Sequence, residues 1–548
     1  MWPICTSLVS KRSPYLFLCL AAFAVYAPAL FAQFTTPKPD PCLETTHPNI
    51  LGATYQYPLA QLGAVSEFFS LGADPPNHGD NGLVYYPFEA YFNRQTPVVL
   101  IIHANPGTGG SHYHHKYWEL MEHLARNGFI AVSYDRFNNA QQIPPRDFIT
   151  DVQQTFGLDA DAPVAIIGHS FGGTMAVEAA MLNWYQGKPL NLQALVGLSP
   201  VSEKDDFLDP TAVPAYFALY GSRDQDTLGW SVFAPDVPAA AHAAYDRAGV
   251  EFSTEGTQTF TPMHKSMAFV YGATHDGWLT SPNLCYPHTG YFSYDDMTCI
   301  AKAYLTGFLR WRIFGQDQYE GMFRGAWKPG SVAAMTTTKS DGWGNPEGSP
   351  VRLFTQFSSE IRRVVNHFDG PDVNYTKSPS LQIARADSML LSSHSPHDTV
   401  ALRVTWQSAN VSQYLRFTVP EGQRDLKRFK DLAFRVGQVH SEPGGYLYNP
   451  YNQDQDFKVW LTDEHNNHRS VWASQFAAIP FPDRYELEES VGACSKPEGD
   501  YSKSAMQTVL IDLDNFSGID QGRIKYIWFE FTRNTFGRIL LDNVEFQR

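Results

Sequence analysis

The chain has 548 residues, of which 41 are basic and 56 acidic, and its formal net charge is −15. This length is typical of two to four domains, and 43% hydrophobic with 14% aromatic residues is enough apolar material for their cores. The acidic balance argues against a nucleic-acid-binding protein and against a basic membrane-surface patch, because both need clustered positive charge.

The N-terminus has the pattern of a secretory signal over residues 1–32. Two basic residues precede an apolar run over 15–25, and small residues follow, so that cleavage is expected after Ala29 or Ala32. The run is too short for a comfortable membrane span. The sequence therefore predicts an exported protein, secreted or periplasmic, without stable membrane insertion.

Four of the six cysteines follow this signal: Cys42, Cys285, Cys299 and Cys494. In an exported chain they suggest two disulfide bonds, with three possible pairings. The short separation of Cys285 and Cys299 in a loop-rich stretch favours their pairing, and Cys42–Cys494 would follow by elimination. None of these spacings is typical of a zinc site.

Short apolar runs alternate with helical periods between about residues 83 and 315. Between the runs at 97–104 and 129–134, apolar residues at i, i+3, i+4 and i+7 from Tyr117 predict a helix that ends near Gly128. Strands that alternate with helices imply βαβ units and a mostly parallel sheet. The runs predicted as strands are 97–104, 129–134, 164–168, 194–198, 215–221 and 266–272.

Beyond this region, Gly, Pro, Ser and Thr become frequent and helical periodicity stops. The apolar pattern then has period two, as over residues 400–406, and such strands between turn-rich segments predict a β-sandwich. We therefore expect a catalytic α/β domain over 43–328, a linker over 329–349 and an all-β accessory domain over 350–548.

The stretch AIIGHSFGGTMAV places Ser170 between a predicted strand and a helix. Gly168 and Gly172 let strand and helix approach each other, which leaves the serine hydroxyl exposed at a sharp turn. A serine nucleophile needs a base, and the base needs an orienting acid. Asp224 follows a strand in LYGSRDQD, and His275 follows a strand in VYGATHDGW. Because carboxyl ends of parallel strands meet at one sheet edge, we expect the three side chains to lie together.

The motifs GHSFGG, GSRDQD and GATHDGW resemble those of α/β-hydrolases of the secreted serine esterase type, which includes dienelactone hydrolases, platelet-activating-factor acetylhydrolases and polyester hydrolases. The resemblance implies an α/β-hydrolase fold in which Ser170 is the nucleophile, His275 the general base and acid, and Asp224 the orienting acid. It also implies that neither a cofactor nor a metal is needed. Asp226 is a rival for the acid, because RDQD contains two carboxylates.

An oxyanion hole needs two backbone N–H groups aimed at the developing charge. The resemblance assigns one of them to Phe171, directly after the serine. HANPGTGG resembles the H-G-x-P loop of these enzymes and assigns the second to Asn105, although Ala104 stands where glycine is usual. An alternative alignment, to the P-G-x loop of polyester hydrolases, selects Thr108.

Other residues near this site are better interpreted as structural than as catalytic. His169 is expected to pack or to form hydrogen bonds away from Ser170. The segment HYHH lacks a partnered carboxylate or cysteine, so a solvated or substrate-rim role is favoured over zinc for its histidines, His112, His114 and His115. Three aromatic residues could line an acyl pocket or belong to the core: Trp230, Trp278 and Tyr291.

The second domain resembles the carbohydrate-binding, galactose-binding-like jelly rolls that are often joined to secreted hydrolases. VVNHFDG resembles their opening strand and RILLDNVEF their closing strand, and such modules often bring residues like Asp369 and Asp542 near a structural calcium. The resemblance implies a polysaccharide or polymer surface as a partner. The simpler role is to cover or rigidify the catalytic domain.

The leading hypothesis is a secreted serine hydrolase that cleaves small-molecule or polymeric carboxylic esters through an acyl-enzyme. One alternative is a C–C hydrolase of β-diketones, as in enzymes that act on oxidised poly(vinyl alcohol). Another is a catalytically inactive hydrolase-fold protein that serves binding or adhesion, against which the intact Ser170, Asp224 and His275 argue. Because all three precede the expected linker, hydrolysis of small esters should need only the first domain.

Overall fold

The computed structural model divides into two units, Met1–Pro39 and Asp40–Arg548, and its named helices and strands lie in the second. The predicted signal over 1–32 lies outside the described residues, among which no helix has the length and apolar character for a bilayer span. The structure describes residues 38–55, 67–69, 82–91, 93–104, 113–135, 144–201, 208–209, 211–224, 230–231, 245, 248, 250–252, 258–260, 264–280, 293–335, 351–356, 362–366, 368, 375–386, 394–395, 401–407, 412–439, 448–450, 453–481, 483–486, 500–503 and 505–548.

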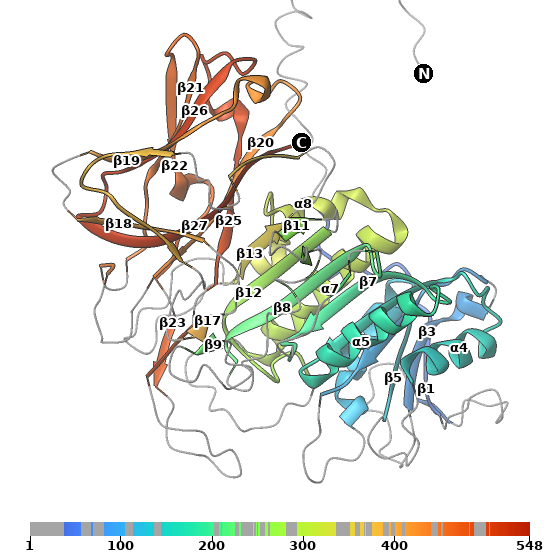
Figure 1. Ribbon diagram of the computed structural model, residues 1–548. Coiled ribbons are helices and arrows are strands. Elements are labelled where there is room, and N and C mark those ends of the chain that lie inside the picture. The colour runs from blue at the N-terminus through green and yellow to red at the C-terminus, as the bar shows by residue number, and fades with distance from the viewer. Residues whose placement is uncertain are drawn as a thin grey trace, which may run out of the picture. The chain divides into compact units, whose positions relative to one another are not determined.

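A ten-stranded mixed sheet organises the first part of the chain, in the order β13-β12-β8-β7-β6-β4-β5-β3-β1-β2 (Figure 1). The six strands from β12 to β5 pair in parallel, and the pairs at both ends are antiparallel. The mostly parallel sheet predicted from the sequence is thereby confirmed. The strands are β1 Ile50–Tyr55, β2 Glu67–Phe69, β3 Gly82–Pro87, β4 Val98–Ile102, β5 Ile130–Tyr134, β6 Pro163–His169, β7 Asn191–Leu198, β8 Ala215–Arg223, β12 His264–Thr274 and β13 Val351–Gln356.

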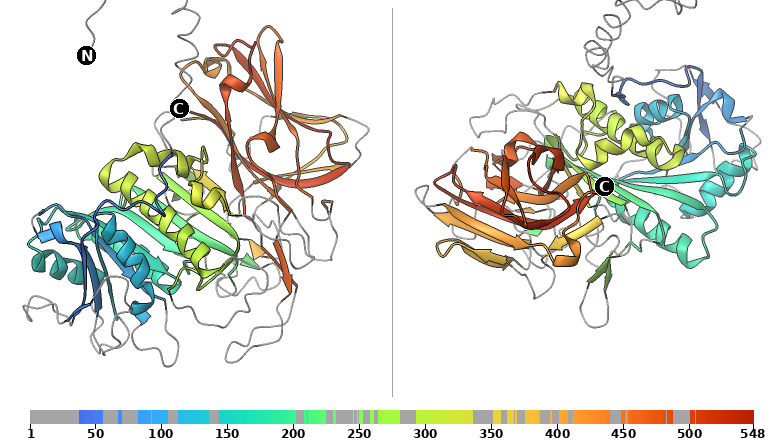
Figure 2. Two further views of the ribbon diagram at one scale, coloured as in Figure 1. Left: turned by 180° about the vertical axis from the view of Figure 1, so that it is seen from behind. Right: turned by 90° about the horizontal axis from the view of Figure 1, so that it is seen from above.

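Helices cover both faces of this sheet (Figure 2). Strand β4 shows why, because its residues alternate between two apolar cores. Leu100 and Ile102 join the core that includes residues of α4 and α5, whereas Val99 and Ile101 join the core that includes residues of α3 and α7. A strand buried on both faces needs such a continuous apolar run. These helices are α3 Trp118–Arg126, α4 Pro145–Thr155, α5 Phe171–Tyr185 and α7 Tyr294–Phe314.

The helix predicted from Tyr117 onward is α3, and it ends as expected. Gly128 follows it with φ +93°, a left-handed conformation that glycine adopts without steric cost. Shorter elements complete this part: η1 Phe88–Tyr91, η2 Tyr113–Tyr117, β10 Val250–Phe252, β11 Gln258–Phe260, η3 Asp317–Tyr319, α8 Glu320–Arg324 and α9 Gly330–Ala333.

The C-terminal part contains two antiparallel sheets around one core, which confirms the predicted sandwich. Strand β19 illustrates the pattern, since Leu415 and Phe417 are buried in this core and Arg416 between them is half-buried. One sheet has the order β16-β18-β27-β20-β25 with β14 on β27, and the other β15-β19-β26-β21-β22. Their bounds are β14 Arg362–Asn366, β15 Tyr375–Lys377, β16 Gln382–Ala386, β18 Ala401–Gln407, β19 Gln413–Thr418, η4 Glu421–Gln423, β20 Asp431–Gln438, β21 Lys458–Asp463, β22 His468–Trp472, η5 Ala473–Gln475, β25 Gln507–Asp512, η6 Leu513–Asn515, β26 Ile524–Phe531 and β27 Phe536–Gln547.

Two strand pairings join segments on either side of the expected linker at 329–349. Strand β13 lies beyond that linker and pairs antiparallel with β12, so it is the edge strand of the first sheet. A separate four-stranded sheet combines β9 (Trp230–Ser231) with three later strands in the order β23-β24-β17-β9. These later strands are β17 His394–Ser395, β23 Asp483–Glu486 and β24 Asp500–Lys503.

The structure contains a disulfide bond between Cys42 and Cys299, so the predicted pairings Cys285–Cys299 and Cys42–Cys494 are wrong. The cause is tertiary: the imidazole of His123 on α3 donates to the carbonyl of Pro41, and α3 packs against α7, the helix that carries Cys299. Separation along the chain cannot reveal this neighbourhood. Cys285 and Cys494 lie outside the described residues.

Candidate active site

Ser170 stands at the turn between β6 and α5 in a backbone conformation that is unusual for a serine. Its φ is 54° and its ψ is −126°. The turn is anchored from both sides, because the Ser170 amide donates to the carbonyl of Leu198 and the Val201 amide donates to the carbonyl of Ser170. This geometry presents the serine side chain at the carboxyl end of β6, as in a nucleophile elbow.

The glycines around Ser170 are required by close backbone contacts. A Cβ atom at Gly168 would overlap the carbonyl of Gly172, and one at Gly172 would overlap the carbonyl of Ile102 at the end of β4. A Cβ atom at Gly173 would overlap Pro200. The motif GHSFGG therefore lets the elbow sit directly on its neighbouring strand.

Asp224 and His275 meet because they follow paired residues on adjacent strands. Arg223 of β8 pairs with Thr274 of β12, and the next residue of each strand is the predicted acid or base. The Nδ1 atom of His275 lies 3.0 Å from each carboxylate oxygen of Asp224. His275 is 2% exposed and Asp224 is fully buried. With Nδ1–H donating to the carboxylate, Nε2 is the nitrogen that can exchange a proton with substrate or nucleophile.

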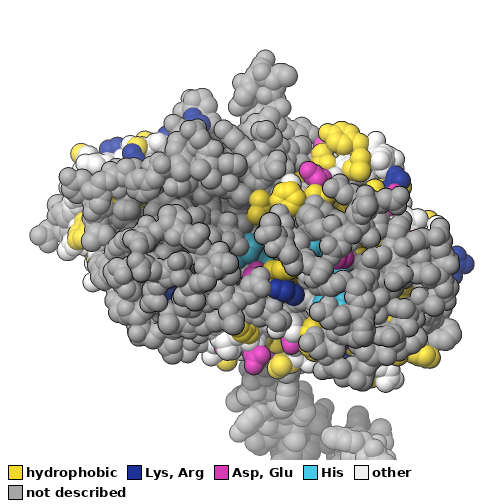
Figure 3. Space-filling model, turned by 90° about the horizontal axis from the view of Figure 1, so that it is seen from below, with side chains coloured by type: hydrophobic (Ala, Val, Ile, Leu, Met, Phe, Trp, Pro, Cys, Tyr) yellow, Lys and Arg dark blue, Asp and Glu magenta, His cyan; other side chains and the backbone are white. Residues whose placement is uncertain are grey.

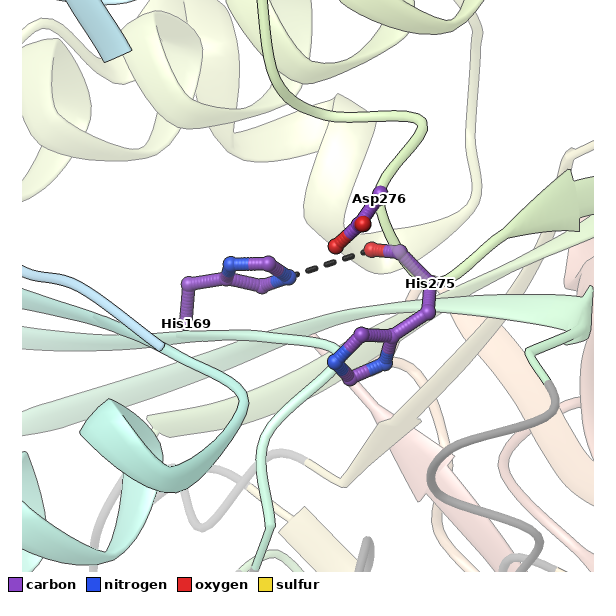
Figure 4. Close-up of side chains that lie close together, drawn as sticks. All are labelled: His169, His275 and Asp276. Carbon is purple, nitrogen blue, oxygen red and sulfur yellow. Dashed lines mark hydrogen bonds between the residues drawn. The ribbon is translucent and has the colours of Figure 1, made fainter. Parts of the chain in front are cut away.

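His169, His275 and Asp276 form a cluster whose candidate ligand atoms all lie within 4.8 Å of one another (Figure 4). The Nε2–H of His169 donates to the His275 carbonyl at 3.1 Å, and Nδ1–H of His275 donates to Asp224. A metal bound by His169 would have to replace one of its hydrogen bonds, because Nε2 faces the His275 carbonyl and Nδ1 faces the Tyr117 hydroxyl. The geometry therefore suits proton transfer better than metal binding, and the absence of a cofactor stays a prediction.

Further polar and aromatic groups support the loop that carries His275. Trp278 is 1% exposed and donates from its indole N–H to Ser199 Oγ at 2.9 Å, which places it in the core next to the end of β7. The Tyr113 hydroxyl lies 3.5 Å from a carboxylate oxygen of Asp276. Figure 3 shows histidine side chains close to acidic and basic ones on one face of the molecule.

Of the three histidines of HYHH, the structure describes His114 and His115. His114 is buried, and its ring packs edge-on against His115 with centroids 4.3 Å apart. His114 is therefore part of the packed interior, which differs from the predicted solvated role. Several other residues singled out from the sequence lie outside the described residues: Asn105, Thr108, His112, Asp226, Tyr291 and Asp369.

Two residues of this region received no predicted role, namely Tyr117 and Asp276. The sequence pattern marks Tyr117 only as an apolar position of a helix, although its hydroxyl lies 2.7 Å from Nδ1 of His169. Asp276 directly follows His275, and its position in THDGW was the one signal for it. In the second domain, Asp542 is 2% exposed and accepts hydrogen bonds from the amide and side chain of Asn543.

One family model and several solved structures are similar to parts of the chain. A family model described as alpha/beta hydrolase fold matches residues 97–228, and no curated protein matches the chain. The chain is similar to the structure of a hyperthermophilic esterase from the archaeon Pyrobaculum calidifontis, with 15% identity and a TM-score of 0.26 over 48% of this chain and 90% of that one.

Two further solved structures are similar to separate parts of the chain. Esterase B from Lactobacillus rhamnosis has 17% identity and a TM-score of 0.21 over 38% of this chain and 78% of its own. A family 11 carbohydrate-binding module from Clostridium thermocellum has 13% identity and a TM-score of 0.21 over 35% of this chain and 97% of its own. The fold assignment itself comes from the sheet order and the family model: an α/β-hydrolase fold followed by an antiparallel β-sandwich. This is the predicted fold class.

Proposed function

We propose that the protein is an exported serine hydrolase that cleaves carboxylic esters through an acyl-enzyme. One observation carries the proposal: the buried His275–Asp224 pair, with its 3.0 Å hydrogen bonds, follows β12 and β8 at the sheet edge where Ser170 occupies an elbow. A nucleophile, a base and an orienting acid on one edge are the components of acyl transfer.

In this mechanism the Oγ atom of Ser170 attacks the ester carbonyl while its proton moves to Nε2 of His275. Nδ1–H stays on the imidazole and donates to the Asp224 carboxylate, which stabilises the imidazolium. Collapse of the tetrahedral intermediate breaks the bond to the leaving alkoxide, which takes the proton from Nε2. Water then attacks the acyl-enzyme with the same base, so that the acid is released and the Ser170 hydroxyl restored.

The negative charge on the carbonyl oxygen needs hydrogen-bond donors. Phe171 directly follows Ser170 and is the first residue of α5, so its amide lies at the N-terminus of that helix. Its amide and the positive end of the helix dipole favour an anion at this position. We propose Phe171 as one donor and Asn105 as the other, with Thr108 as the alternative to Asn105.

Turnover of p-nitrophenyl esters of increasing acyl length tests the proposal directly. The purified chain should hydrolyse at least the short esters and should lose this activity after treatment with a fluorophosphonate. Ser170→Ala and His275→Ala should each reduce kcat by roughly 10⁴-fold or more without loss of folding. Substantial activity in folded Ser170→Ala would contradict the mechanism, and turnover of a β-diketone but of no ester would reassign the substrate class.

For the second domain we propose attachment to a polysaccharide or polymer surface. Its five-stranded sheet carries half-buried aromatic side chains on the face opposite the core, with Trp460 and Trp528 stacked at 4.9 Å and Tyr414 beside Trp528. Aromatic rings supply apolar contact area that ring-shaped sugars can cover. Co-sedimentation with insoluble cellulose and with a polyester powder tests this role, and Trp460→Ala with Trp528→Ala should weaken it.

A further inference from the structure

A buried chain of hydrogen bonds runs behind the proposed active site. The Ala104 amide lies 3.3 Å from the Tyr117 hydroxyl, and that hydroxyl lies 2.7 Å from Nδ1 of His169. The Nε2 atom of His169 lies 3.1 Å from the carbonyl oxygen of His275 (Figure 4). Each of these residues is less than 5% exposed. These hydrogen bonds therefore connect the segments that carry Ala104, His169 and His275 through buried groups.

The direction of every hydrogen bond in this chain follows from the groups involved. A carbonyl oxygen only accepts, so Nε2 of His169 carries a proton, and in the neutral imidazole Nδ1 must then accept. The Tyr117 hydroxyl therefore donates to Nδ1 and accepts from the Ala104 amide. Burial raises the pKa of Tyr117 well above its ordinary value, which keeps this hydroxyl protonated and able to donate. The chain thus selects one tautomer of His169.

The connected loops are those that carry the proposed chemistry. His169 directly precedes Ser170, Ala104 directly precedes the segment assigned to the second oxyanion donor, and the acceptor carbonyl belongs to His275 itself. The rings of His169 and His275 also pack with centroids 4.9 Å apart. One side chain on the nucleophile elbow thus contacts both the backbone and the imidazole of the base.

We propose that His169 and Tyr117 are positioning residues, which fix the backbone and ring of His275 relative to Ser170. This inference rests on the proposed function, since it assigns a role within that site. Displacing a catalytic group by about 1 Å can reduce a rate about 100-fold. An apolar side chain in place of His169 would fill the space, but it would deprive the buried His275 carbonyl and the Tyr117 hydroxyl of this partner.

Steady-state kinetics on a short p-nitrophenyl ester test the proposal. Tyr117→Phe should lower kcat about 10- to 100-fold with little change in KM, because it disturbs the geometry of the reacting groups rather than substrate contacts. The matched control is Tyr304→Phe, since Tyr304 is also buried and lies on α7 in the core. It should leave kcat within about twofold of wild type, because it removes a buried hydroxyl that is not part of this hydrogen-bond chain and keeps the ring in place.

Variants of His169 add a test by partial rescue. His169→Gln keeps a side-chain N–H donor, whereas His169→Leu keeps only volume, so the glutamine variant should retain more kcat. Thermal unfolding verifies that both are folded. The proposal is overturned if folded Tyr117→Phe and His169→Leu keep wild-type kcat, or if Tyr304→Phe loses as much as Tyr117→Phe.

Imidazole ¹⁵N spectra of the wild-type protein give a readout that does not depend on activity. The His169 signals, assigned by their loss in His169→Gln, should show the tautomer with the proton on Nε2, and Tyr117→Phe should shift Nδ1. The opposite tautomer would overturn the hydrogen-bond chain. A wild-type protein that hydrolyses no ester and does not react with a fluorophosphonate refutes the proposed function instead, while the tautomer still tests the chain.

Discussion

The backbone at Ser170 carries information that its hydroxyl alone does not. A φ of 54° is uncommon for a residue with a Cβ atom and costs of order 1–3 kcal/mol, and such strain concentrates at functional sites. Glycine would make the same turn without that cost. A serine at this position is therefore better explained by chemistry than by the turn.

The identity of the orienting acid can be tested by two neighbouring substitutions. Asp224→Asn should reduce kcat by about 10⁴-fold, because an amide cannot hold Nδ1–H and stabilise the imidazolium as a carboxylate does. Asp226→Asn makes the same change two positions later and should cost less than about tenfold. Kinetics with a p-nitrophenyl ester distinguish them, and the reverse order would assign the acid to Asp226.

Strand β12 contains a register shift that brings His275 opposite Asp224. Val270 pairs with Gly221 but Thr274 pairs with Arg223, so β12 has two more residues than β8 over this stretch. Gly272 lies within it at φ +86°. With regular pairing, Ala273 rather than His275 would lie opposite Asp224. The bulge thus re-aims the end of the strand, as bulges near active sites commonly do.

Gly272→Ala tests this bulge, because alanine at a positive φ costs about 1–2 kcal/mol. The variant should unfold at a lower urea concentration than the wild type. Its kcat should also fall, and by more than in a control variant that loses similar stability, because His275 follows the bulge. Gly157→Ala is the matched control: it also has positive φ, +63°, and a Cβ there would meet nothing within 4 Å, but it precedes β6, whose other end carries Ser170. Equal loss of kcat in both folded variants would contradict the role of the bulge.

The disulfide bond attaches the N-terminal segment to α7. Cys42→Ser with Cys299→Ser should reduce the free energy of unfolding by about 2–5 kcal/mol, which thermal or urea unfolding of the oxidised proteins would measure. A reducing agent should bring the wild type toward the variant. Mass spectrometry of a non-reduced digest should find Cys42 linked to Cys299, and a Cys285–Cys299 peptide would contradict the structure.

His123 makes the contact between α3 and this segment sensitive to pH. Burial lowers its pKa to about 4, and the positive charge of Lys302 acts in the same direction. Between about pH 6.5 and 4, His123 is protonated in the unfolded chain but neutral in the folded one. The free energy of unfolding therefore falls as pH decreases through this range, by at most about 3 kcal/mol. Urea unfolding at pH 7, 5.5 and 4.5 should show a smaller decline for His123→Gln. The buried His264, whose pKa is also lowered by burial, contributes to the decline that remains.

At the scale of the whole molecule, the C-terminal part is joined to the first by more than a linker. β13 extends the first sheet. β17 pairs with β9, a strand that follows Asp224 closely in the sequence. Arg324 of α8 forms a 3.1 Å ion pair with Asp431 of β20. Apolar residues of the C-terminal part also join a core of the first part: Ala401, Val439, Ala505, Met506 and Leu540.

Two shortened chains test this connection. A chain ending at Ser349 should have a lower Tm than the full chain and should aggregate, because the apolar edge of β12 loses its partner. A chain ending at Gln356 keeps β13 and should be intermediate. Ester turnover per folded molecule should fall in both, since β9 loses β17. Full activity and equal Tm in all three would show instead that the first domain is self-sufficient, as the sequence alone suggested.

Features that arise from local patterns can be predicted from the amino-acid sequence. Continuous apolar runs identified the strands β4 to β8 and β12, since a strand buried on both faces needs them, and GHSFGG identified the elbow because a sharp turn from strand to helix needs glycines beside its serine. Asp224 and His275 followed from the rule that carboxyl ends of parallel strands share one edge.

Features that depend on which distant segments meet are visible only in the folded chain. The Cys42–Cys299 bond, the pairing of β13 with β12 and the hydrogen bond between Tyr117 and His169 each join residues whose neighbourhood has no local signal. An apolar or aromatic residue looks the same in sequence whether it fills a core or orients a base. Burial then makes the difference, because a polar group without water must find its partner within the fold.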